Sequence, residues 1–392
     1  MDPVVMEEED NLIHETQLKR KENDGEEEEE ATTVTNKKKK IETATEGLLF
    51  CQSSAHPFDV MWLDLNDIRY DESEKSHAIP EEAILKLSRL MEVYHIYSFS
   101  VIGACNGLVC LADDYCDDAP IYIVDPIQKY SLTLCNLDAY NPNNVIAGFG
   151  YDSYSGNYKV LTMFNDEMLD IGCSLQTVHP VHGVLDHQYI MPCFDINLRG
   201  MSQLGAFFGG KLHFAMMKKV SGVYSFDKIL CFDLREEDFS TMPGPDFVDI
   251  PDEMSVELTL FGDGRLIFVV YHGHHTRFWL WDDRICSWMS EEVELFGRED
   301  GPPLKPLAPL PGGFLLVRYY RSLFSYDLSE KTYTLLYDGL LCPVRIVPFT
   351  PNAKPIVGSD CLDGTCAVEL SDAPEKSSGF PVWKKDDMWN PT

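Results

Sequence analysis

A tight turn followed by an apolar strand recurs along this chain, and its spacing constrains the fold more than any other feature. The first clear copy runs from Gly103 to Leu111, where Asn106-Gly107 suits a turn because both residues tolerate positive φ. Copies of the turn end at Gly107, Gly156, Gly210, Gly264, Gly313 and, more faintly, Gly364, at intervals of 49, 54, 54, 49 and 51 residues. Repeats of about 40 to 50 residues with a few strands each are typical of a β-propeller.

A second signal, an apolar strand that ends in Asp, runs in step with the first. It occurs at Asp64, Asp125, Asp233, Asp282 and Asp327, while the repeat that begins at Gly156 lacks it. An Asp at this position can end a strand and accept hydrogen bonds from the following turn. We therefore predict an all-β, kelch-like propeller of about six blades. Val344–Phe349 is predicted to be a late strand that completes the blade begun at Gly47, because propellers avoid an open edge in this way.

The sequence divides into a tail, a folded domain and a second tail. Residues 1–46 hold 15 acidic and 7 basic residues, so we expect them to be disordered. Residues 47–370 should form the propeller, and residues 371–392 a flexible tail rich in Pro, Ser, Asp and Lys. Two basic clusters in the first tail fit either a bipartite nuclear-import signal or a charge-balanced solvated segment: Lys19, Arg20, Lys21, Lys37, Lys38, Lys39 and Lys40.

The first blade is interrupted by residues 69–92, which we interpret as a loop insertion with a short helix. Apolar residues at positions 84, 87, 90 and 91 would share one face of a helix. Pro80 suits the first turn of such a helix. The prediction is a short amphipathic helix within a long loop.

Composition excludes several classes of partner. The net charge is −32, which argues against binding to nucleic acid and to anionic membrane surfaces. The acidic N-terminus has no apolar signal region, and no apolar run approaches the ~20 residues needed to span a bilayer. The 12 cysteines have no disulfide-like or zinc-like rhythm. Reduced thiols in a nuclear or cytosolic protein are the simplest interpretation, so we expect the nucleus, the cytoplasm or both.

Several short motifs follow one another in a fixed order: Cys105–Leu111, Val124–Pro126, Gly148–Asp152 and Tyr158–Val160, and then Gly210–Phe214 and Phe232–Leu234 in the next unit. In order and spacing these motifs resemble the plant F-box-associated domain. Asp125 stands where the family usually has Asn before Pro. The fold-signature residues are Asn106, Gly107, Gly148, Gly150, Tyr151, Asp152, Tyr158 and Lys159.

The resemblance implies a substrate-recognition domain of SCF-type E3 ubiquitin ligases. In such proteins an N-terminal F-box binds the Skp adaptor, which is joined to a cullin, and the propeller captures a target protein. An F-box would be a helical stretch of about 45 residues, and residues 1–46 contain none. Ile79–Leu90 imitates its opening but runs into a strand at Tyr97–Gly103. We therefore expect a protein-protein interaction module that does not bind the Skp adaptor directly; its target and its binding face are unknown.

Histidine clusters offer an alternative function. His272, His274 and His275 could hold a transition metal, as on a propeller-scaffold enzyme, but their place between two predicted strands favours an exposed hairpin turn. We predict no enzyme activity, no metal and no cofactor. A third possibility is a nuclear decoy that competes with related F-box receptors. Loops at the propeller faces are the natural partner-contact candidates, among them His179–Gln188 and Tyr271–Arg277.

Overall fold

A computed structural model describes residues 47–351 and 367–369 of the protein, apart from a set of loop stretches within the first range. The stretches left out are 53–58, 81–82, 90–98, 114–120, 128–129, 135–145, 166–170, 180–181, 191–203, 221–222, 246–254, 290–292, 298–300 and 341–343. The predicted tails 1–46 and 371–392, the basic clusters and Gly364 lie outside the described residues.

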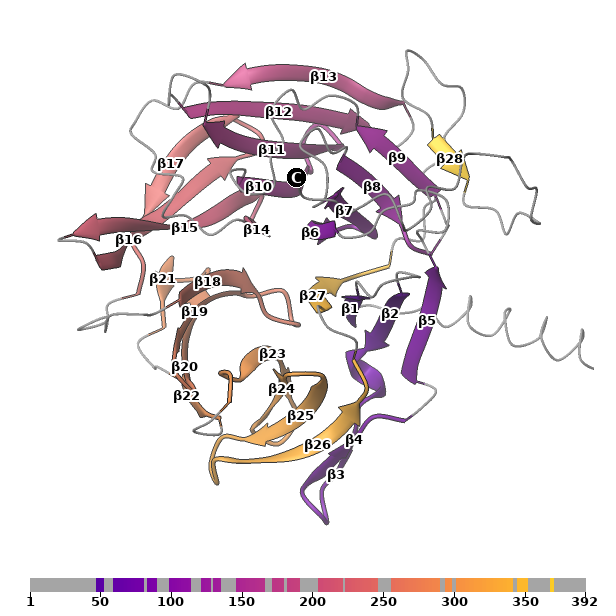
Figure 1. The fold of residues 1–392 in the computed structure, drawn as a ribbon, viewed down its shortest axis with the longest axis vertical. Coiled ribbons are helices and arrows are strands. Elements are labelled where there is room, and N and C mark those ends of the chain that lie inside the picture. Colours follow the sequence, from indigo (N-terminus) through magenta and orange to yellow (C-terminus); the bar gives the residue numbers. More distant parts are fainter. Residues whose placement is uncertain are drawn as a thin grey trace, which may run out of the picture.

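Six antiparallel sheets stand in a ring around one axis, which confirms the predicted six-bladed propeller (Figure 1). Each of the first three blades is given from its innermost strand outward. Blade 1 contains β27 (Val344–Phe349), β1 (Gly47–Gln52), β2 (Asp59–Asp64) and β5 (Ile84–Arg89). Blade 2 contains β6 (Phe99–Cys105), β7 (Leu108–Asp113), β8 (Ile121–Asp125), β9 (Tyr130–Leu134) and β28 (Ala367–Glu369). Blade 3 contains β10 (Ile146–Asp152), β11 (Asn157–Asn165), β12 (Ile171–His179) and β13 (Gly183–Ile190).

The other three blades have the same order of strands. Blade 4 contains β14 (Ala206–Phe208), β15 (Lys211–Val220), β16 (Val223–Asp233) and β17 (Asp238–Met242). Blade 5 contains β18 (Ser255–Leu260), β19 (Leu266–His272) and β20 (His275–Asp282), and the last pairs with both β21 (Ser287–Trp288) and β22 (Val293–Phe296). Blade 6 contains β23 (Lys305–Leu310), β24 (Phe314–Tyr319), β25 (Ser322–Asp327) and β26 (Thr332–Asp338).

The repeated glycines and aspartates do what the sequence predicts. Asn106 has φ 47° and Gly107 φ 79°, and the turn glycines at 156, 210, 264 and 313 have φ between 75° and 84°. These turns join the first and second strands of their blades. Asp327 Oδ1 accepts the Ser329 N–H at 2.8 Å, and Asp64, Asp125, Asp233 and Asp282 accept the N–H two residues on in the same way. The Asp turn therefore recurs in five blades, all but blade 3, and the glycine turn recurs in blades 2 to 6.

The ring closes where the two ends of the propeller meet. β27 pairs antiparallel with β1 along its whole length, from Gly47 opposite Phe349 to Gln52 opposite Val344. This confirms the predicted closing strand. Blade 1 is thus assembled from both ends of the domain, which leaves no open edge at the axis.

The predicted short helix in residues 69–92 is wrong. Residues 84–89 form β5, the outermost strand of blade 1, which pairs with β2. The run Leu85-Lys-Leu-Ser88 alternates apolar and polar residues as well as it fits a helical face, and pairing with β2 decides between the two. The helical element that precedes this insertion is η1 (Leu65–Asp67), a single 3-10 turn.

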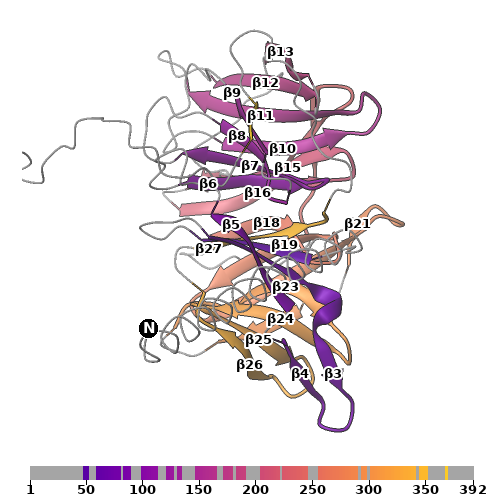
Figure 2. The same cartoon turned by 90° about the vertical axis from the view of Figure 1, so that its right-hand side faces the viewer.

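The insertion also contains a hairpin, β3 (Arg69–Asp71) with β4 (Ser76–Ala78), that lies beside β26 of blade 6 in both views (Figure 1, Figure 2). Buried His77 places its Nδ1 3.1 Å from Ser325 Oγ, and its ring lies between those of Tyr70 and Phe314. The hairpin therefore joins blade 1 to blade 6 at the same junction that β27 closes.

The hydrophobic core lies in the seams between blades rather than in one central mass. Each of six buried clusters draws its side chains from two neighbouring blades, because alternate residues of a strand point to opposite faces of its sheet. Leu49 and Trp62, for example, face blade 2, whereas Leu48 and Leu63 face blade 6. In the described part of the chain, no helix is long and apolar enough to cross a membrane.

Candidate functional site

The fold-signature residues of blades 2 and 3 meet in one seam. The Tyr158 hydroxyl, on β11, donates a hydrogen bond to the backbone oxygen of Asn106, in the turn of blade 2, at 3.3 Å. The Tyr158 ring stacks on Phe149 at a centroid distance of 5.6 Å, and Tyr151 packs at 5.0 Å. Burial raises the pKa of Tyr158, so the phenol remains a neutral donor. These residues fasten blade 3 to blade 2.

The two signature glycines act in the next seam, between blades 3 and 4. A methyl group on Gly148 would overlap Leu212, and one on Gly150 would overlap Phe207 and Leu234. The bare backbone of β10 therefore lets the aromatic and leucine side chains of blade 4 come close. Glycine is required here for close packing, and not for an unusual φ.

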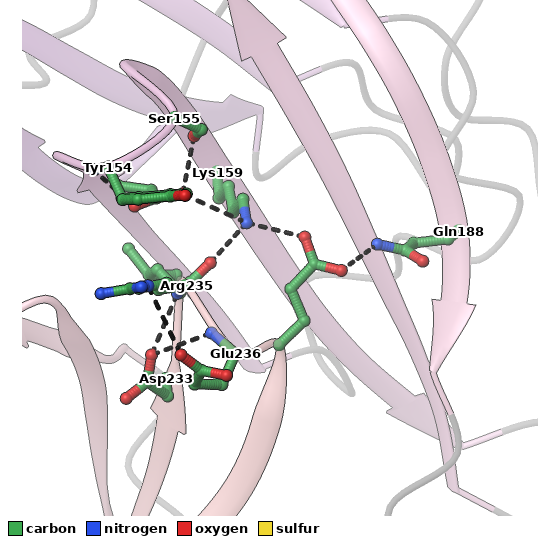
Figure 3. Close-up of polar contacts among 10 residues, drawn as sticks. Tyr154, Ser155, Lys159, Gln188, Asp233, Arg235 and Glu236 are labelled. Carbon is green, nitrogen blue, oxygen red and sulfur yellow. Dashed lines mark hydrogen bonds and ion pairs between the residues drawn. The ribbon is translucent and has the colours of Figure 1, made fainter.

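Lys159 completes this second seam with a buried charge. Its Nζ donates to the Leu234 carbonyl oxygen and to Glu237 Oε1, the latter at 2.7 Å, and lies 3.7 Å from Asp152 Oδ2 (Figure 3). Gln188 of β13 donates to the second oxygen of Glu237 at 2.5 Å. Burial alone would raise the pKa of Asp152, but hydrogen bonds from Ser155 and the Tyr154 N–H and the Lys159 charge together lower it. Blade 3 is thus joined to the turn after β16.

Two exposed side chains stand over this seam. Tyr154, in the turn between β10 and β11, is 76% exposed, and the Arg235 guanidinium lies 4.2 Å from the centre of its ring. Both belong to turns that the Lys159 network holds in place (Figure 3). Tyr and Arg are enriched among residues that dominate binding energy at protein interfaces. Tyr154 and Arg235 therefore form an exposed ring–guanidinium contact above the buried Lys159 network.

A second polar group lies where blades 5 and 6 meet, on β18, β19 and β23. Lys305 Nζ on β23 is 2.6 Å from Glu257 Oε1 on β18, and the Tyr271 hydroxyl donates to Glu257 Oε2 at 2.9 Å. Burial would raise the pKa of Glu257, but the Lys305 charge and the hydrogen bonds from Lys305 and Tyr271 lower it. The Arg345 charge on β27 acts in the same direction. Glu257 is therefore an ionised centre among cations from neighbouring blades.

The histidine runs form turns. His272 ends β19 and His275 begins β20, with Gly273 between them at φ 57°. The His275 ring packs edge-on against Phe296 at 4.9 Å and lies 4.1 Å from His274. Around His179–Gln188 the chain runs from the end of β12 into β13, and the His179 and His182 rings stack at 4.5 Å. Among the residues with a described position, no three His, Cys, Asp or Glu side chains gather closely enough to hold a metal ion.

Sequence reasoning singled out Lys159 only as part of a motif and missed the Glu257 group. One signal for Glu257 was present: in Ser255-Val-Glu-Leu-Thr-Leu260 a carboxylate alternates with residues that face the core. The partners of Glu257 come from three other strands, and their spacing along the sequence does not predict that they meet.

Comparison with known proteins agrees with this fold and this motif. Residues 33–297 match the family described as F-box associated beta propeller domain. Two Arabidopsis thaliana proteins are similar over shorter stretches. F-box/kelch-repeat protein At3g23880 is 25% identical over 38% of this chain and 39% of its own length, and F-box protein At5g10340 is 24% identical over 41% and 38%. The chain thus spans less than half the length of these curated relatives.

Solved structures are similar only distantly. Apo AztD from Citrobacter koseri has a TM-score of 0.39 and 10% identity, covering 79% of this chain and 100% of that one. The Dos1 propeller has a TM-score of 0.36 and 9% identity, covering 76% and 73%.

The blades, their seams and the turn motifs define a closed six-bladed propeller. With the family match across most of its length, the chain belongs to the F-box associated beta propeller domain family. Its sixth blade and closing strand, beyond residue 297, follow the same architecture.

Proposed function

We propose that this chain is a non-enzymatic recognition module that captures a target protein in a ubiquitin-ligase setting. The observation that carries the proposal is the use of the family signature: Asn106, Tyr158 and Lys159 fasten blades 2, 3 and 4 together. Because the signature residues hold the blades together, the exposed turns and loops are free to differ according to the target that is bound. The similar Arabidopsis proteins carry F-box names, which supports target capture as the role of the propeller.

Contact with the Skp adaptor and its cullin is proposed to occur through another subunit. The segment that imitates an F-box opening, within Ile79–Leu90, contributes β5 to the ring. Its backbone pairs with β2, so adaptor binding as a helix would require blade 1 to lose its outer strand. Within this segment the described residues 84–89 are a strand of the ring, which favours adaptor contact through another subunit.

Affinity capture of the tagged protein from its own tissue, read by mass spectrometry, tests the proposal. We expect reproducible enrichment of a target, together with adaptor and cullin brought by another subunit. Loss of adaptor and cullin, with the target retained, would favour a stand-alone binder or a decoy. Enrichment of no protein over a scrambled-loop control would contradict target capture itself.

Localisation in the nucleus, the cytoplasm or both is part of the proposal. It rests on the basic clusters Lys19–Lys21 and Lys37–Lys40, whose charge and spacing suit an import receptor. A fluorescent fusion should lose nuclear signal when residues 37–40 are changed to Ala. An unchanged distribution would remove the import role from these lysines.

A further inference from the structure

The exposed pair above the Lys159 network is held in place from below. The N–H of Tyr154 donates to Asp152 Oδ1 at 2.9 Å, and the N–H of Arg235 donates to Asp233 Oδ1 at 3.0 Å. Lys159 joins the two turns, because its Nζ lies 3.7 Å from Asp152 Oδ2 and donates to a backbone carbonyl oxygen in the turn after β16. Both side chains therefore project from backbone that is already ordered, so a partner that contacts them has little left to order.

Three side chains of these two turns present a ring, a cation and a carboxylate to solvent. Tyr154 is the most exposed of the large aromatic and aliphatic side chains in the described residues. The Arg235 side chain is 59% exposed and the Glu236 side chain 69% exposed, and Arg235 Nε lies 3.4 Å from Glu236 Oε1. The three lie together on one side of Lys159, with the Arg235 guanidinium against the Tyr154 ring (Figure 3). We name Tyr154, Arg235 and Glu236 the Tyr154 platform.

The charge around the Tyr154 platform is negative. Acidic side chains outnumber basic ones in the two turns and the strands that flank them: Asp152, Asp233, Glu236, Glu237 and Asp238 against Lys159, Lys211 and Arg235. Each of the three cations already has a carboxylate neighbour. The whole chain has a net charge of −32, so its long-range field attracts basic segments and repels acidic ones. Charge complementarity at this surface therefore favours a positively charged partner.

We propose that the Tyr154 platform binds a basic, arginine-containing segment of the target protein. The proposal rests on the proposed function, because it names the chemistry that the recognition module binds. An arginine of the partner can stack on the exposed side of the Tyr154 ring, as Arg235 stacks on it within the chain. Glu236, which is mostly exposed, supplies a carboxylate for another basic residue of the same segment. The ring provides the central contact, and the negative field of the chain selects the charge of the segment.

Three labelled decapeptides of one Gly/Ser sequence, carrying three arginines, three glutamates or no charge, test the proposal with the full chain. Fluorescence anisotropy measures binding at about 0.1 M and about 1 M salt, between which the Debye length falls from about 10 Å to about 3 Å. We expect the arginine peptide to bind with a Kd of about a millimolar or tighter at the lower salt, and more weakly at the higher. Preference for the glutamate peptide, equal binding of all three, or binding of none would overturn the proposal.

Variants assign the binding to the platform rather than to the overall charge of the chain. Tyr154→Ala and Glu236→Gln should each weaken binding of the arginine peptide about two- to fivefold, because an exposed ring–cation contact and an exposed ion pair are each modest. The double variant should weaken it about tenfold. Circular dichroism should show an unchanged fold, since both side chains are exposed. Equal binding by the double variant and the wild type would overturn the proposal.

The chain offers a matched control for each substitution. Glu330→Gln removes a carboxylate at the same position of a turn, because the Glu330 N–H donates to Asp327 Oδ1 as the Glu236 N–H donates to Asp233 Oδ1, each at 3.1 Å. Tyr320→Ala removes a ring that is 56% exposed in the turn between β24 and β25, on the opposite face of the propeller. Both controls should bind the arginine peptide as the wild type does. Losses as large as those of the platform variants would assign the binding to general charge and overturn the proposal.

A capture experiment separates this inference from the function on which it rests. If the wild type enriches a target from tissue extract and the Tyr154→Ala, Glu236→Gln double variant loses it, both stand. If the double variant retains the same target at the same yield, recognition stands and the platform is wrong. If the wild type enriches none while the arginine peptide binds through Tyr154, the platform stands and target capture is wrong.

Discussion

Lys159 and Glu237 form a 2.7 Å ion pair that crosses the seam between blades 3 and 4, and the Lys159 side chain is only 5% exposed. Removing the lysine would leave Asp152 and Glu237 without their shared cation in a largely dry seam. We expect Lys159→Ala to lower the free energy of unfolding by about 2 to 4 kcal/mol, since Glu237 keeps some solvent contact. Urea denaturation provides the measurement.

Lys211→Ala is the control for that loss. Lys211 pairs with Asp233 at 2.9 Å on the same blade, but its side chain is 41% exposed. An exposed pair of this kind contributes about 0 to 1 kcal/mol. Equal losses in the two variants would show that burial of Lys159 does not increase its contribution to the free energy of unfolding.

Gly150 makes a steric prediction about the same seam. A methyl group there would overlap Phe207 and Leu234, so we expect Gly150→Ala to destabilise the propeller by about 1 to 3 kcal/mol through overpacking. Gly209→Asn is its matched control, because Gly209 faces open space with φ 59°, which Asn tolerates. Thermal unfolding followed by circular dichroism measures the effect. Equal melting temperatures for both variants and the wild type would contradict the packing role of Gly150.

The sequence predicted the repeating parts of this fold because their causes are local. A positive φ at Gly107 and an Asp that accepts the N–H two residues on each depend on a few neighbouring residues. Residues 84–89 were mispredicted because a short run fits periods of 3.6 and of 2, and only pairing with β2 distinguishes them. The closing strand at Val344 was predictable from the general need to cover an edge.

The candidate sites were less accessible to sequence reasoning. Lys159 and Glu237 are 78 residues apart, and Glu257 and Lys305 are 48 apart. Each pair forms because the ring brings consecutive blades side by side. In a strand that alternates polar and apolar residues, a charged residue can face solvent or can pair with a charge on the next blade. The sequence of the strand alone does not distinguish these two cases.

Closure of the ring by β27 makes a prediction about truncation. A chain ending at residue 343 would lack β28 of blade 2 as well as Val344–Phe349, and the edge of β1 would be unpaired beside an opened apolar seam. We expect it to aggregate, because an open, apolar edge strand is a template for association. A chain ending at residue 370 retains every strand of the ring and should elute as the intact protein does in size-exclusion chromatography. Normal elution of the shorter chain would mean that blade 1 is stable without its innermost strand.

His213 makes a prediction about acid. It lies on β15, is 5% exposed, and places its Nδ1 3.3 Å from the Ala206 carbonyl oxygen. Burial is the main reason that its pKa falls to about 4. An unfolded histidine titrates near 6.5, so between about pH 6.5 and 4 the unfolded chain takes up a proton that the folded chain refuses. The contribution of neutral His213 to the free energy of unfolding should therefore be fully present above pH 6.5. It should fall by roughly 3 kcal/mol as the pH drops toward 4.

Replacing this histidine should flatten that part of the pH profile. We expect His213→Leu to lose less free energy of unfolding between pH 7 and pH 4.5 than the wild type, whatever its stability at neutral pH. Urea denaturation at half-unit steps of pH measures the difference, and buried carboxylates contribute equally to both proteins. His272→Leu, at the exposed end of β19, controls for the loss of one histidine and should follow the wild-type profile. Parallel profiles for His213→Leu and the wild type would show that the folded protein protonates His213 as readily as the unfolded chain does.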